Sequence, residues 1–301
     1  MVWNLMMRGW VFLVGIEDRF YYNQLSETAK VIYDKLIDEQ ESLKSGNSVI
    51  RFDKNEFDSL LSRDDGMTIL SQEYQNAADA IRYDVMDMFY IDYTKMALKT
   101  VTYTRGKYKS YEVFLAPVEE NGTYFEDGIN EEQIDIMEKK LDEISNEIIS
   151  NAQGSNYQKI QYIHNWLIDN LSYDMSYEGE HTRDIYGALE YRDVVCEGYS
   201  KAFKYLLDKL EIPCIIVAGQ ATNSEGNLEN HMWNYVKIND IWYSVDVTWD
   251  DPILTNLDSL PDEYRYKYFC QGDNINSNHI LSDTITPNGQ LYVYPELYHK
   301  E

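Results

Sequence analysis

Cysteine is scarce in this chain of 301 residues, and histidine is sparse as well. The three cysteines, Cys196, Cys214 and Cys270, show no CxxC spacing, which argues against a disulfide framework and a structural zinc site. No two of the five histidines stand at the HxxxH spacing that would put both on one helical face as metal ligands. We therefore predict no metal and no other cofactor, while cysteine nucleophile chemistry stays open.

Basic residues are also few. The chain has 26 Lys and Arg against 52 Asp and Glu, so its formal net charge is 26 − 52 = −26. Such a surface repels phosphate backbones and anionic lipid, and no concentrated basic patch offsets it, so we expect neither nucleic-acid binding nor electrostatic membrane docking. The hydrophobic fraction of 44% is nevertheless enough for a packed core.

A long uninterrupted apolar run is missing too. Residues 1–16 form an apolar lead segment, but Asn4 and Arg8 interrupt it, and the clean stretch from Gly9 to Ile16 is too short to span a membrane. No small-residue cleavage site follows it. We expect a strand or helix packed on the body; the alternatives are a degenerate signal segment and the tail of a truncated anchor.

Periodicity divides the N-terminal part into helices and strands. Apolar residues recur at three- and four-residue spacing over residues 25–43 and 71–88, which predicts two helices. The segment that follows is rich in Tyr, Val and Thr and predicts strands at residues 89–93, 98–103 and 108–115. Together these elements predict an α+β accessory domain over residues 17–128.

Two further helices connect this region to the rest of the chain. Asn130 opens a capping box, and the apolar spacing after it predicts a connecting amphipathic helix within residues 129–152. A polar break leads to a helix over residues 157–171, with His164 on its apolar face. We interpret His164 as a core histidine rather than a ligand or a base. The remaining domain covers residues 153–301.

The most informative stretch begins at Cys196. Apolar spacing from Tyr199 to Leu210 predicts a helix that ends before Pro213, so Cys196 lies at the helix N-terminus. Unpaired backbone N–H groups and the positive end of the helix dipole there favour a thiolate, the nucleophilic form of cysteine. The alternative is the usual fate of a free cysteine, a small buried hydrophobe.

A predicted hairpin supplies a histidine and a carboxylate. The apolar runs 232–238 and 241–248 flank Asn239-Asp240, a two-residue turn signal that pairs Ile238 with Ile241. In that register Trp233 faces Asp246, so His231 and Asp246 are diagonal neighbours on one sheet face. Diagonal Cβ atoms lie about 7–8 Å apart, within reach of an imidazole and a carboxylate.

Cys196, His231 and Asp246 thus form a candidate catalytic triad. The imidazole can take the thiol proton and later pass it to a leaving amine, while the carboxylate stabilises the imidazolium. The backbone N–H of Cys196 is available to a developing oxyanion. The sequence identifies no second oxyanion donor.

The motifs around these residues resemble a known family. Val195-Cys196-Glu197-Gly198-Tyr199, His231-Met232-Trp233-Asn234-Tyr235 and Trp242-Tyr243-Ser244-Val245-Asp246 occur in the order seen in the bacterial branch of the transglutaminase-like superfamily. The likeness extends over about residues 155–280. Residues 1–128 also resemble the accessory region of some Gram-positive members.

The resemblance implies a fold and an activity. It implies an α+β chain with a papain-like, transglutaminase-like core, in which a helix carrying Cys196 packs on an antiparallel sheet. The implied activity is acyl transfer through a thioester on protein or peptide amides. Water as the acceptor makes a protease or deamidase, and a lysine amine makes a transglutaminase. The alternative is a non-catalytic module that binds peptide or cell wall on the same fold.

Other residues carry weaker predictions. Trp233, Tyr191 and Trp249 are candidates for substrate binding, although core packing explains them equally well. We interpret Asp250 and Asp251 as a solvated turn rather than cation ligands. His279 is a rival base for which no periodicity places a carboxylate partner.

The expected partner is a protein or peptide substrate, with cell-wall peptide as one candidate. The lack of a disulfide framework permits the cytoplasm and the Gram-positive cell surface alike. Because related proteins are often exported, we favour the cell surface.

Overall fold

The computed structural model describes residues 19–126, 128–176, 179–223, 226–252, 261–282 and 291–299. The predicted lead segment, residues 1–16, lies outside the described residues. Within these ranges, no helix has both the length and the apolar character needed to cross a bilayer.

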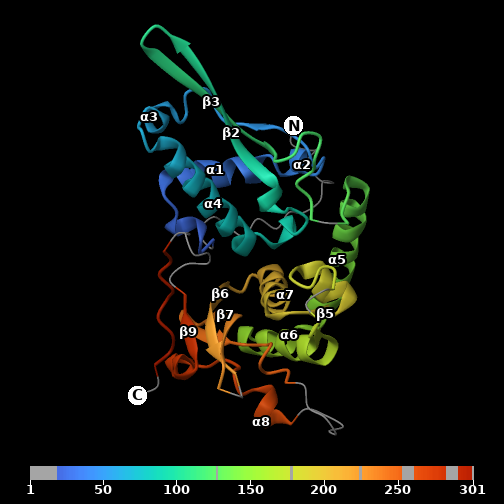
Figure 1. The fold of residues 1–301 in the computed structure, drawn as a ribbon. Helices are drawn as coiled ribbons and strands as arrows, with labels where there is room; N and C mark the ends of the chain where they lie inside the picture. Colours follow the sequence, from blue (N-terminus) through green and yellow to red (C-terminus); the bar gives the residue numbers. More distant parts are fainter. Residues whose placement is uncertain are drawn as a thin grey trace, which may run out of the picture.

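The N-terminal region combines helices with a small antiparallel sheet of order β1-β3-β2. Its α-helices are α1 (Glu27–Asp38), α2 (Gln40–Leu43), α3 (Asp58–Leu61) and α4 (Gly66–Asp84). Its strands are β1 (Ile50–Arg51), β2 (Met96–Arg105) and β3 (Tyr108–Pro117). Strands β2 and β3 form a long hairpin that extends away from the helices (Figure 1).

The predicted elements of this region are partly confirmed. Ser26 caps α1 by accepting from the backbone N–H of Ala29, but the helix predicted over residues 25–43 is interrupted at Glu39. The strand predicted at residues 89–93 is wrong, because one 3-10 helix, Met86–Met88, ends just before it and another, Tyr93–Lys95, begins at its last residue. Between them, Ile91 makes only an isolated bridge to Phe125.

The C-terminal region places helices against a four-stranded antiparallel sheet of order β8-β7-β6-β9 (Figure 1). Its helices are α5 (Glu131–Asn151), α6 (Asn156–Asn170), α7 (Cys196–Lys209), α8 (Asp262–Arg265) and the π-helix η5 (Gly187–Tyr191). The sheet contains β6 (Cys214–Thr222), β7 (Leu228–Ile238), β8 (Ile241–Val245) and β9 (His279–Leu281). A short parallel pair joins β4 (Ser172–Tyr173) to β5 (Asp193–Val194).

Local sequence signals determine where α5 and α6 begin. The side chains of Asn130 and Gln133 form a capping box at the start of α5, and Ser155 and Gln158 form another at the start of α6. In each box two backbone N–H groups that the helix cannot satisfy find acceptors. The predicted capping box and the polar break between the two helices are therefore confirmed.

The β7–β8 hairpin has the predicted register. Ile238 pairs with Ile241, and both turn residues, Asn239 and Asp240, have the positive φ that a tight two-residue hairpin turn requires. The ladder ends at the pair Asn234 and Val245. Asp246 therefore follows the last paired residue of β8, and other segments hold it in place.

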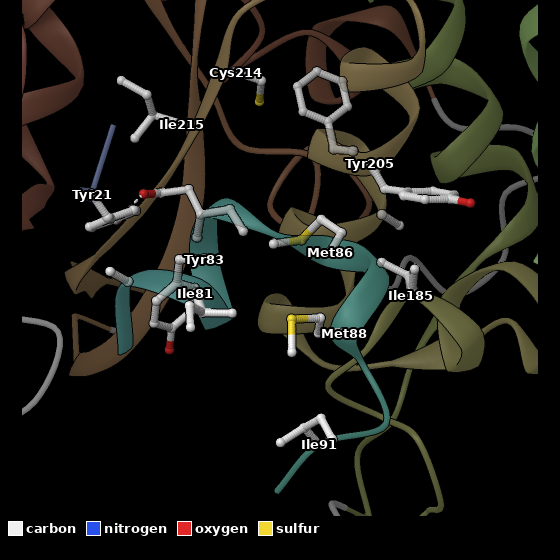
Figure 2. Close-up of a cluster of buried hydrophobic side chains, with 14 of the residues drawn as sticks. Tyr21, Ile81, Tyr83, Met86, Met88, Ile91, Ile185, Tyr205, Cys214 and Ile215 are labelled. Carbon is white, nitrogen blue, oxygen red and sulfur yellow. Dashed lines mark hydrogen bonds between the residues drawn. The ribbon is translucent and has the colours of Figure 1, made fainter. Parts of the chain in front are cut away.

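A hydrophobic cluster joins the two regions (Figure 2). Side chains from α4 and the turn after it, among them Ile81 and Met86, lie in one buried cluster with Tyr205 of α7 and Ile215 of β6. Tyr21 adds a polar link by donating its hydroxyl to the backbone carbonyl of Ile216. The accessory region thus packs directly on the helix and sheet that carry the site; the boundary near residue 128 stays a prediction.

Candidate active site

Cys196 is the first residue of α7, as predicted, and it is partly exposed. Val195 at the N-cap is extended, and its side chain caps no helix N–H. The next turn packs tightly, because a Cβ on Gly198 would lie 2.6 Å from the Cβ of Val194 and 2.8 Å from the carbonyl of Thr182. This glycine lets the first turn of α7, which begins with Cys196, approach its neighbours closely.

His231 and Asp246 form a buried hydrogen-bonded pair. Nε2 of His231 lies 2.7 Å from Oδ2 of Asp246, and the two side chains are 4% and 0% exposed. The other carboxylate oxygen accepts from the backbone N–H of Trp249 at 3.1 Å. The diagonal pairing predicted from the hairpin therefore brings these two groups into direct contact.

The surroundings of this pair favour the charged forms of both His231 and Asp246. Burial alone would lower the pKa of His231, but the Asp246 charge, its hydrogen bond and the contact with Cys196 raise that pKa to about 10. Burial would raise the pKa of Asp246, yet His231 and His279 hold it well below its ordinary value. At neutral pH the pair is therefore imidazolium and carboxylate.

The contacts also determine how the His231 ring is oriented. An ionised carboxylate only accepts hydrogen bonds, so Nε2 of His231 carries a proton and donates it to Asp246. Nδ1 is the other ring nitrogen, and the neighbouring Cys196 raises the pKa of this ring. Cys196 and Asp246 thus both influence the His231 ring.

His279 also contacts the Asp246 carboxylate. It lies on β9, is 2% exposed, and its Nε2 lies 3.0 Å from the same Oδ2 of Asp246. The sequence placed no carboxylate partner for His279, and the structure shows one, Asp246. Periodicity could not reveal the contact, because β9 joins the sheet through β6 and no hairpin turn in the sequence sets that pairing.

Aromatic rings enclose the two histidines. Trp249 stacks on His231 with ring centroids 4.8 Å apart, so it lies beside the His231–Asp246 pair, and its role in substrate binding stays a prediction. Trp233 is 1% exposed and packs its ring against His279, so of the two alternatives left open by the sequence, core packing and groove lining, it takes the first. Tyr191 is exposed and packs edge-on against Tyr186; its role in substrate binding stays a prediction.

A second buried histidine–carboxylate pair lies nearby. Nε2 of His164 lies 3.0 Å from Oδ2 of Asp250, and both side chains are fully buried. The interpretation of His164 as a core histidine is confirmed. The interpretation of Asp250 as part of a solvated turn is wrong, and Asp251 also has an internal partner, accepting from the Tyr199 hydroxyl at 2.7 Å.

A metal ion has one candidate donor set among the described residues. Donor atoms of His231, Asp246 and His279 lie within 4.8 Å of one another. The two Nε2–Oδ2 separations, 2.7 and 3.0 Å, are hydrogen-bond lengths. An ion would have to displace both protons and spread these donors, so we interpret the cluster as a hydrogen-bonded one.

Comparison with known proteins identifies the domain that carries this geometry. Residues 142–247 match the family model of the transglutaminase-like superfamily, so the chain contains a domain of that superfamily. The matched range includes Cys196, His231 and Asp246. The resemblance is thereby confirmed, as is the α+β fold class, with α7 packed on an antiparallel sheet.

Individual relatives are distant. The chain is 22% identical over 138 residues to the kyphoscoliosis peptidase of Homo sapiens and equally to that of Mus musculus, covering 42% of this chain and 20% of each relative. It thus spans about a fifth of their length. A crystal structure of a TGase is similar over 58% of this chain and 50% of its own, with 14% identity and a TM-score of 0.35, too low to bear on activity.

Proposed function

We propose that this chain catalyses cysteine-dependent acyl transfer on protein or peptide amides, with Cys196 as nucleophile, His231 as general acid and base, and Asp246 as the carboxylate that orients His231. One observation carries the proposal: the buried His231–Asp246 pair, connected to Cys196 at the start of a helix. The transglutaminase-like domain and its distant peptidase relatives support the same chemistry.

The proposed reaction has two steps. Cys196 attacks as the thiolate: its sulfur forms a bond to the amide carbonyl carbon, the C–N bond breaks, and the His231 imidazolium gives its proton to the departing amine, leaving a thioester and a neutral imidazole. In the second step an acceptor attacks the thioester, its proton passes to His231, and the thiolate leaves. The backbone N–H of Cys196 can stabilise the oxyanion in both steps.

One experiment identifies the acceptor that attacks the thioester in the second step. The protein is incubated with a glutamine-containing protein substrate, with and without a labelled primary amine, and the products are identified by mass spectrometry. Chain cleavage or conversion of Gln to Glu indicates water as the acceptor, and amine incorporation indicates a crosslinking enzyme. We expect Cys196→Ala to lose all of these products while its melting temperature stays close to that of the wild type.

Thiol alkylation provides a test that needs no substrate. Burial raises the pKa of Cys270 to about 12 and that of Cys214 further still, so both should react slowly near neutral pH. We expect iodoacetamide to modify Cys196 far faster than either one. Equal rates at the three thiols, together with no turnover in the substrate experiment, would instead support a non-catalytic binding module.

A further inference from the structure

The Asp246 carboxylate has a second histidine donor, and the triad described above does not require one. We propose that His279 is a positioning residue, which holds the Asp246 carboxylate in the orientation that meets Nε2 of His231. The inference deepens the proposed function and rests on it for its effect on rate. Its structural part concerns only contacts among Asp246, His231 and His279.

The His279 ring is held at both nitrogens. Nε2 lies 3.0 Å from Oδ2 of Asp246, and Nδ1 lies 2.8 Å from Oδ1 of Asn278. Asn278 is itself fixed, because its amide donates to the hydroxyl of Tyr268 at 3.1 Å. Ionised Asp246 and the amide oxygen of Asn278 both only accept, so each of these contacts requires an N–H on the His279 ring.

The faces and edges of the same ring are also confined. Trp233 and Trp249 pack against His279 with centroid distances of 4.8 and 4.9 Å, both in edge-on geometry. A ring with both nitrogens bonded and two indoles around it has little freedom to turn. His279 is therefore a rigid donor, suited to fix the orientation of the Asp246 carboxylate.

The sheet brings His279 to this place through a close strand approach. β9 pairs with β6, with His279 opposite Ala221 and Leu281 opposite Gly219. A Cβ at Gly219 would lie 2.1 Å from the carbonyl oxygen of Ile280 and 2.8 Å from the Trp233 ring. Glycine is thus required here for β9 and Trp233 to approach as closely as they do.

Asp246 needs such a donor because the hairpin does not hold it. It follows the last ladder pair of β8, and its side chain is fully buried. Besides His231, only the Trp249 N–H and His279 donate to its carboxylate among the described contacts. Without His279, Oδ2 would keep one donor in a site closed to water, and the carboxylate could turn away from His231.

A pair of substitutions separates hydrogen bonding from packing. His279→Leu removes the donor, whereas His279→Gln can keep an N–H near the position of Nε2. We expect His279→Leu to slow iodoacetamide alkylation of Cys196 by about tenfold or more, the size of loss known for removal of the hydrogen-bond partners that orient metal-binding histidines. His279→Gln should restore most of that rate. Cys270 in the same sample is the internal control, and His164→Leu, which removes another buried histidine, should leave the Cys196 rate unchanged.

Two results would overturn the proposal: an unchanged Cys196 rate in His279→Leu, or equal slowing in the Leu and Gln variants, which would indicate packing alone. If the Leu variant does not fold, NMR of protein labelled with 15N-histidine decides. Asp246→Asn should shift the ring N–H resonances of both His231 and His279, and a shift of only one refutes the shared contact. If the wild type shows neither turnover nor selective alkylation of Cys196, the proposed function is refuted. The NMR result on the shared Asp246 contact would still stand.

Discussion

Two buried histidine–carboxylate pairs lie close together in this domain and behave differently. His231–Asp246 and His164–Asp250 have similar Nε2–Oδ2 distances, 2.7 and 3.0 Å, and their carboxylates come from the same turn. Yet the first pair is charged and the second is neutral. Burial raises the pKa of Asp250 to about 9 and lowers that of His164 to about 4, so neither group is ionised at neutral pH.

The difference comes from the donors around each carboxylate. Asp246 receives two imidazole N–H groups and one backbone N–H, which stabilise its negative charge. Asp250 receives the backbone N–H of Tyr268, and the nearby charge of Asp246 raises its pKa further. The same pair of residue types therefore forms an ion pair or a neutral hydrogen bond according to its neighbours.

The largest effect that distinguishes the pairs should come from Asp246→Asn. This change removes the charge that stabilises the His231 imidazolium and puts an amide where two N–H donors converge. We expect the kcat for amide turnover to fall by about 10⁴-fold, by analogy with the same change in serine triads. The measurement is the initial rate with the glutamine-containing substrate.

Asp250→Asn is the matched control, since it is the same Asp-to-Asn substitution four residues away. Its rate should stay close to that of the wild type. Wild-type turnover in Asp246→Asn, or equal losses in the two variants, would contradict the assignment of Asp246 to the site.

Asp250→Asn should also change stability in a pH-dependent way. Because the folded-state pKa of Asp250 is raised from 3.8 to about 9, the unfolded chain releases this proton well below the pH at which the folded chain does. The wild type therefore loses stability as pH rises between these values. Asparagine is neutral throughout and can donate to His164 while accepting from Tyr268, so it avoids that loss.

Urea unfolding at pH 5 and pH 8 measures this effect. We expect the variant to be more stable than the wild type at pH 8, with a gain that grows from pH 5 by at most about 1.4 kcal/mol per pH unit. A gain that is independent of pH, or a loss at pH 8, would show that Asp250 is ionised in the folded protein.

The sequence predicted the first pair because local rules determine it. The Asn239-Asp240 turn sets the register, and the two-residue period of a strand puts His231 and Asp246 on one face. The start of α7 likewise follows from apolar spacing after Cys196. These predictions need no contact between distant segments.

The rest depends on long-range packing that no local pattern encodes. His279 reaches Asp246 through the β6–β9 pairing, and His164 reaches Asp250 because α6 packs against the turn after β8. The sequence predicted a solvated turn at Asp250 and Asp251 because their buried partners also come from distant segments. The sequence shows their polarity, but the buried partners are far away in the chain.

The smallest expected effect concerns the rings that pack on each histidine. Trp249 stacks on His231 at 4.8 Å, and Phe269 packs on His164 at 4.7 Å. Each contact should contribute about 0.5–1.5 kcal/mol beyond burial, so Trp249→Leu and Phe269→Leu should both lower the free energy of unfolding. Only Trp249→Leu should also lower kcat, by about three- to tenfold, because the proposed reaction uses His231, and not His164, for proton transfer. Comparable losses of kcat in the two variants would mean that the His164 pair also supports the reaction, and the functional distinction between the two pairs would not hold.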